Sequence, residues 1–138
     1  MKLLALIDGN SLLHRAFHAL PPMTTREGTP TGALFGFLSM LLKVLTEEQP
    51  DGMLVAFDEH GPTFRHEMFD AYKAGRQETP DDLRAQFPLL RELLEKMRIR
   101  TLSMQGLEAD DIIGIFSRKA EKEGVRSLIV TGDRDALQ

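Results

Sequence analysis

Cysteine is absent from the sequence, so a disulfide scaffold and a thiolate metal site are both excluded. No apolar stretch is long enough to cross a membrane. The apolar run at the N-terminus ends after a few residues at Asp8, without the small-residue cleavage site of a signal peptide. From these absences we expect a cytoplasmic protein with no part in the membrane.

An excess of basic residues is also lacking, because the net charge is -4 at pH 7. Nucleic-acid-binding domains are usually basic, so the sum of charges does not indicate one. The positions of the charges matter more than their sum, since acids can cluster at one site while bases line another surface. The length of 138 residues, with 42% hydrophobic and 28% charged residues, is typical of one compact soluble domain.

Short apolar runs alternate with longer segments of helical pattern along the chain. Strands are predicted over residues 3–7, 53–57, 99–103 and 127–131, and helices over 11–19, 32–47, 80–94 and 108–123. The helix over 32–47 is apolar on nearly all sides, so we expect it to be well buried. Pro88 should kink its helix or shift the helix start. The alternation predicts an α/β fold with a mostly parallel sheet flanked by helices.

Acidic residues follow every predicted strand. In a parallel sheet the carboxyl ends of the strands share one edge, so these carboxylates are expected to face one crevice. Carboxylates packed that closely repel one another and favour a hard divalent cation with oxygen ligands. The chain has no cysteine, and none of its four histidines belongs to the acidic set. This favours Mg²⁺ or Mn²⁺ over zinc. The predicted metal ligands are Asp8, Asp58, Glu108, Asp110, Asp111, Asp133 and Asp135.

Each acid also has an ordinary structural interpretation. A lone aspartate after a strand is usually a turn former or a helix cap, and acids at a helix start are favoured by the helix dipole. These interpretations are good for each residue singly, but recurrence after four successive strands favours a shared site. The histidines are expected to be surface or packing residues: His14, His18, His60 and His66.

Residues 60–79 mix basic and aromatic residues without a clean period. Arg65, Lys73 and Arg76 could hold phosphates, and Tyr72 could stack on an unpaired base. Arg15, after the first strand, is a weaker phosphate candidate. The alternative is a solvated loop with ordinary basic residues.

Several motifs together resemble the 5′ nuclease domain attached to bacterial DNA polymerases of type I. The resemblance runs through the whole chain in the same order, and the set of motifs is highly specific. The motifs are Ile7-Asp8-Gly9-Asn10-Ser11, Arg15-Ala16-Phe17, Ala56-Phe57-Asp58, Phe64-Arg65-His66-Glu67, Tyr72-Lys73-Ala74-Gly75-Arg76, Gly106-Leu107-Glu108-Ala109-Asp110-Asp111 and Thr131-Gly132-Asp133-Arg134-Asp135.

The resemblance implies a PIN-like (Rossmann-like) domain over residues 1–138 that cuts DNA at 5′ ends, flaps or nicks in replication and repair. The seven acids match the metal site of the family, which in its complete form would hold two Mg²⁺ or Mn²⁺ ions. Residues 60–79 match its helical arch, where Arg65, Tyr72, Lys73 and Arg76 contact the 5′ strand and the basic residues assist at the scissile phosphate. Family members continue beyond this length, so we expect a truncated N-terminal portion whose partners include the remainder of the nuclease domain or a polymerase region.

Two other functions remain open. The first is a catalytically inactive DNA-binding module that retains the fold. The second is an aspartyl-phosphate phosphatase using Asp8, although such enzymes usually have a second carboxylate two residues later, where this chain has Asn10.

Overall fold

A parallel four-stranded sheet organises the chain, as expected. The computed structural model describes residues 2–19, 21, 23–58 and 81–132. Within them the strand order is β3-β2-β1-β4 and every pairing is parallel. In chain order the elements are β1 (Leu3–Asp8), α1 (Gly9–Ala19), α2 (Gly32–Glu47), β2 (Gly52–Ala56), α4 (Asp81–Arg84), α5 (Gln86–Lys96), β3 (Arg100–Leu102), α6 (Ala109–Lys122) and β4 (Arg126–Val130).

The register of the sheet brings the strand ends level with one another. Asp8 pairs with Ala56 at the end of β2, and Ile7 pairs with Val130 at the end of β4. Since β1 lies between these two strands and is buried along its last four residues, its final residue sits in the middle of the edge. The residues that follow each strand therefore emerge side by side, which is the condition for a shared site.

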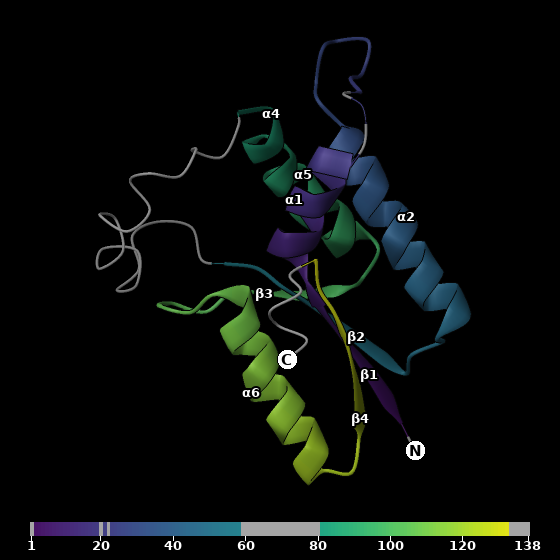
Figure 1. The fold of residues 1–138 in the computed structure, drawn as a ribbon, viewed down its shortest axis with the longest axis vertical. Helices are drawn as coiled ribbons and strands as arrows, with labels where there is room; N and C mark the ends of the chain where they lie inside the picture. Colours follow the sequence, from purple (N-terminus) through teal and green to yellow (C-terminus); the bar gives the residue numbers. More distant parts are fainter. Residues whose placement is uncertain (1, 20, 22, 59–80, 133–138) are drawn as a thin grey trace.

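Helices cover both faces of the sheet (Figure 1). On one face Ile7 and Val55 pack against apolar residues of α1, α2, α4 and α5. On the other face Leu6 and Leu54 pack against α6. Alternate residues of a strand point to opposite faces, so the continuous apolar runs of β1 and β2 are what a sheet covered on both sides requires.

The expectation that α2 is well buried is wrong for its outer side. Phe37 and Leu41 are in the core, but Phe35 is 58% exposed and Leu42 is 55% exposed. The helix packs on α1 and α5 through one side only, so its apolar residues exceed the surface available to bury them. An all-round apolar pattern thus gave the helix bounds correctly and its burial incorrectly.

Pro88 shifts the start of its helix, as one of the two expected outcomes. The helical segment divides at Ala85 into α4 and α5, and Pro88 is the third residue of α5, where a missing amide hydrogen removes no intrahelical bond. Gln86 is buried at this junction. Its amide donates to the Asp82 carbonyl at 3.0 Å, and its Oε1 accepts the Leu34 N–H at 2.9 Å.

The remaining predicted elements are present with small shifts of their bounds. The first helix begins at Gly9 rather than residue 11, and the third strand is only three residues long. Gly124, with φ +75°, follows the end of α6. Within the described ranges, no helix combines the length and the apolar character needed to cross a membrane.

Candidate metal centre at the carboxyl edge of the sheet

Acidic residues on three elements meet at the carboxyl edge of the sheet. Asp8 ends β1, Asp58 follows β2 by two residues, and Glu108, Asp110 and Asp111 stand at the start of α6. Helices α1 and α6 both begin at this edge (Figure 1). Their N-terminal dipoles therefore add partial positive charge where the carboxylates gather.

Asp8 is the most deeply placed of these acids. Its side chain is only 7% exposed, and its Oδ1 accepts the Ser11 N–H at 3.0 Å. Burial raises the pKa of Asp8 above its ordinary value, hydrogen bonds from Ser11 oppose the rise, and the charges of Asp58 and Asp110 add to it. The charged form of Asp8 is thus disfavoured where it stands, and a nearby cation would favour it.

Asp58 is fixed from three directions. Its backbone N–H donates to Asn10 Oδ1 at 2.8 Å, and its Oδ1 accepts the Ala109 N–H at 2.7 Å. Its carbonyl accepts a bond from Arg91 Nη2 at 3.2 Å. These contacts join the end of β2 to α1, α5 and α6.

The start of α6 is a capping box. The Glu108 side chain accepts the backbone N–H of Asp111, and Asp111 Oδ2 accepts the Glu108 N–H at 3.0 Å. Asp110 lies between them in sequence, is exposed, and is close enough to Asp8 for its charge to act there. The acids at this helix start therefore have two distinct surroundings.

Three of the acids accept hydrogen bonds at helix starts, which agrees with their ordinary structural interpretation as caps. Asp8 caps the first turn of α1, Asp58 accepts from the first residue of α6, and Asp111 belongs to the capping box. Within residues 2–58 and 81–132, as far as the structure describes them, no three His, Asp or Glu side chains are arranged to hold one ion together. Asp8, Asp58 and Asp110 are nevertheless electrostatic neighbours, because the charges of Asp58 and Asp110 both act on Asp8.

The other predicted site residues divide into described and undescribed ones. Arg15 is on the exposed side of α1. His14 is half-buried with its ring 5.9 Å from that of Phe87, and burial and His18 lower its pKa, so it is a packing residue as predicted. Eight candidate residues lie outside the described residues: His60, Arg65, His66, Tyr72, Lys73, Arg76, Asp133 and Asp135.

Arg91 is a residue at this edge that sequence reasoning missed. Its guanidinium lies 4.7 Å from the centre of the Phe57 ring while Nη2 bonds the Asp58 carbonyl. Burial lowers the pKa of Arg91, and the charge of Asp58 opposes that shift. The sequence did indicate that Arg91 faces the protein interior. It follows Phe87 by four residues and precedes Leu94 by three, on the apolar side of the helix.

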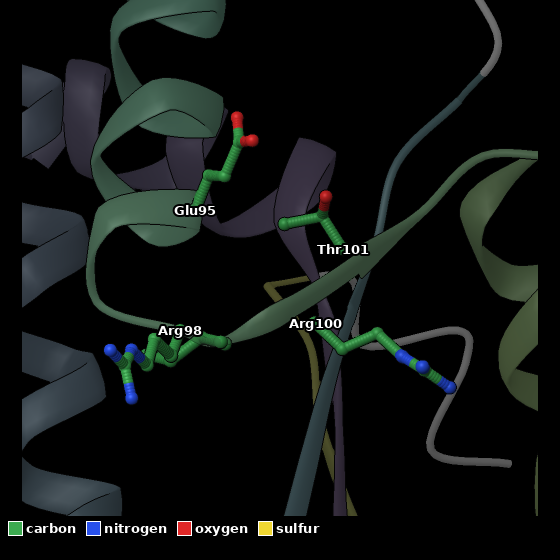
Figure 2. Close-up of a pocket in the computed structure, with 5 residues that line it drawn as sticks. Glu95, Arg98, Arg100 and Thr101 are labelled. Atoms are coloured by element: carbon green, nitrogen blue, oxygen red, sulfur yellow. The ribbon is translucent and has the colours of Figure 1, made fainter.

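A hollow of about 400 Å³ lies away from the acids, between the end of α5 and β3. Its polar lining residues include Glu95, Arg98, Arg100 and Thr101. Figure 2 shows the side chains of Arg98 and Arg100 projecting in different directions. Since the two charges do not converge on one point, this hollow is a poor site for an anion, and the carboxyl edge is the better candidate.

Comparison with known sequences yields one family that covers nearly the whole chain. Its profile, described as 5′-3′ exonuclease, N-terminal resolvase-like domain, matches residues 3–138. DNA polymerase I of Bacillus caldotenax is 53% identical over 137 residues, and that of Geobacillus stearothermophilus is 53% identical over 135 residues. The thermostable DNA polymerase I of Thermus aquaticus is 44% identical over 133 residues. These alignments cover 99%, 98% and 96% of the chain, but only 16%, 15% and 16% of the respective relatives.

Solved structures with the same fold come from bacteriophage T5. The T5 5′-exonuclease with bound divalent zinc ions superposes with a TM-score of 0.65 at 21% identity, covering 98% of this chain and 51% of that one. A T5 flap endonuclease complex with DNA and metal ions gives a TM-score of 0.63 at 20% identity, covering 98% and 50%. At this identity the likeness establishes the fold, and the predicted PIN-like arrangement is confirmed.

Proposed function

Because the chain belongs to the 5′–3′ exonuclease N-terminal resolvase-like domain family, we propose that it forms part of a divalent-metal-dependent 5′ nuclease. Its substrate would be DNA with 5′ ends, flaps or nicks, and its reaction the hydrolysis of a phosphodiester. The chain spans about a sixth of the length of the DNA polymerases it matches. An attached polymerase region, and a role in replication and repair, are therefore parts of the proposal.

One observation carries the proposal: Asp8 is nearly buried at the centre of the edge and faces the charges of Asp58 and Asp110. A carboxylate in such a place is destabilised unless a cation is near. A purely structural cap would be better exposed, because solvent stabilises its charge. The raised pKa of Asp8 is consistent with a site built to receive a positive ion.

The donor set suits Mg²⁺ or Mn²⁺, because every candidate ligand at the edge offers oxygen. Asp8, Asp58 and Asp110 would hold the first ion, with Glu108 and Asp111 close by. Asp133 and Asp135 follow β4 in the sequence and complete the proposed set. When bound, such ions supply an activated water and neutralise the charge that develops on the phosphate oxygens.

The protein's own contribution would be binding and orientation. Arg65, Lys73 and Arg76 would hold the phosphate and stabilise its developing charge, and Tyr72 would stack on an unpaired base. Arg15, exposed near the middle of α1, would contact a phosphate farther along the strand. The inactive DNA-binding module stays the alternative, since relatives of this fold are about twice as long.

Cleavage of a 5′-flapped DNA duplex by the purified chain tests the proposal. We expect product with MgCl₂ or MnCl₂, no product with a chelator, and no product from Asp8→Asn. The matched control is Asp51→Asn, an exposed acid at the amino end of β2 whose Oδ2 accepts the Leu3 N–H at 2.7 Å. Flap binding without cleavage in any metal would favour the inactive module instead.

A further inference from the structure

A line of hydrogen bonds crosses the carboxyl edge from α6 to β4 through two residues to which the proposed mechanism gives no role. Asn10 and Ser11 are the second and third residues of α1. Asn10 Oδ1 accepts the Asp58 N–H at 2.8 Å, and Asp58 Oδ1 in turn accepts the Ala109 N–H at 2.7 Å. On the other side, Ser11 Oγ lies 3.1 Å from Thr131 Oγ1 and accepts the Gly132 N–H at 2.9 Å.

These bonds reach far along the chain. Polar side chains in the first turn of a helix ordinarily bond to backbone groups within a few residues, as caps. Asn10 instead contacts a residue 48 positions away, and Ser11 contacts residues 120 and 121 positions away. Only a weaker 3.5 Å contact from Ser11 Oγ to the Asp8 carbonyl is local. The two side chains thus connect the end of β1 to the ends of both neighbouring strands.

At both connections a glycine allows the chain to pack closely. A Cβ added to Gly9 would lie 2.6 Å from the Phe57 ring, so α1 starts directly against the end of β2. A Cβ added to Gly132 would lie 2.7 Å from the Ser11 carbonyl oxygen, so the end of β4 touches the same turn. At Gly132 no side chain separates the two backbones, so the short Ser11 hydroxyl can set the spacing there.

We propose that Asn10 and Ser11 are positioning residues, which hold the ends of β2 and β4 at a fixed spacing from Asp8 so that the acids of the three strands can share a divalent cation. This rests on the metal site of the proposed function. Ligand-bearing segments need such outer hydrogen-bond partners, because an oxygen displaced by a fraction of an ångström no longer fits the ion. Neither residue needs to touch the ion itself.

Calorimetric titration of the full chain with MnCl₂ tests the proposal without relying on cleavage. Asn10→Ala and Ser11→Ala should each weaken Mn²⁺ binding by about 10- to 100-fold, the usual cost of losing an outer partner. Ser11→Thr keeps the hydroxyl, so it should bind within a few-fold of wild type. Ser39→Ala is the matched control, since the Ser39 Oγ donates to the Phe35 carbonyl on the exposed side of α2.

The outcomes separate the inference from the function on which it rests. Alanine variants that melt earlier yet bind Mn²⁺ as tightly as wild type would overturn the inference and leave the metal site standing. A wild-type chain that binds no Mn²⁺ would overturn the proposed function and the positioning role together. If either alanine variant does not fold, Asn10→Gln and Ser11→Cys take its place, with the same loss expected because the amide is displaced and the thiol bonds weakly.

Discussion

The starts of α1 and α6 both carry aspartates, but the two helix starts place them in opposite surroundings. Asp8 precedes α1, is almost fully buried and has a raised pKa, with burial as the largest cause. Asp110 is exposed in the first turn of α6, and Asp111 is occupied in a reciprocal capping box. Helix capping explains Glu108 and Asp111 without any ligand. It does not explain why the chain buries Asp8 beside other negative charges, so the functional argument rests mainly on α1.

The largest effect should come from removing the charge of Asp8 while keeping a side-chain oxygen that caps α1. Asp8→Asn keeps an oxygen that can accept the Ser11 N–H, and asparagine caps helices as well as aspartate does. We expect flap cleavage to fall by more than about 100-fold, beyond the usual cost of losing an outer partner. Unfolding in a chelator should show stability equal to or above that of wild type, because a buried charge is gone.

Asp8→Ala is the companion variant. It should lose cleavage equally and also lose about 1 kcal/mol of stability, because alanine cannot cap α1. If Asp8→Asn cleaved DNA at the wild-type rate, Asp8 would be a cap and nothing more, and the contrast between the two helix starts would have no functional meaning.

A moderate effect is expected at Asp110, the exposed acid whose charge acts on Asp8. Asp110→Asn should weaken Mn²⁺ binding by at least about 10-fold, because losing an outer partner of a metal site alone costs that much. Its melting temperature in a chelator should not fall, since the side chain is exposed and removing its charge relieves repulsion. Calorimetry and thermal unfolding on the same sample check both statements, and a drop in stability with unchanged affinity would assign Asp110 to the fold alone.

For Asp111 we expect the reverse of Asp110, with a clear loss of stability and a smaller effect on Mn²⁺ binding. Asp111→Ala removes the acceptor of the Glu108 N–H and should lower the free energy of unfolding by about 1 kcal/mol. Denaturant unfolding in a chelator measures this directly. The control is Asp81→Ala, whose side chain is 98% exposed and makes a 3.9 Å ion pair with Arg84. Equal losses in both variants would mean that the capping box contributes nothing specific.

The smallest effect concerns pH. Since the pKa of Asp8 in the folded chain lies above its ordinary value of 3.8, the folded state holds a proton that the unfolded state has released. Stability in a chelator should therefore decline as the pH rises from 3.8 through the raised pKa of Asp8. Asp8→Asn should lack this decline. Parallel pH profiles for wild type and Asp8→Asn would contradict the assignment of the raised pKa to burial of a charged Asp8.

Much of the fold could be predicted from local patterns. The apolar runs of β1 and β2 and the helix over 32–47 needed only periodicity and turn residues, and their bounds agree with the structure to within a residue or two. The burial of α2 could not be predicted, because the exposure of Phe35 and Leu42 depends on which neighbours lie against that helix. Local pattern fixes the element, whereas tertiary contacts decide how much of it is covered.

The candidate site shows the same division. The position of acids after each strand predicted that Asp8, Asp58 and the start of α6 would meet, since parallel strands end at one edge. The long-range contacts of Asn10, Ser11 and Arg91 were beyond reach, because they join residues 33 or more positions apart. The roles of Asp133 and Asp135 stay predictions from the sequence.

Binding of Mn²⁺ to the wild-type chain, measured beside Asp8→Asn by calorimetry at neutral pH, tests the central claim most directly. The account predicts that the wild-type chain binds the ion and that the variant, still folded and still capped at α1, binds it far more weakly. Equal binding by the two proteins, or none by either, would contradict it, and Asp8 would then be a buried cap whose charge serves no ion.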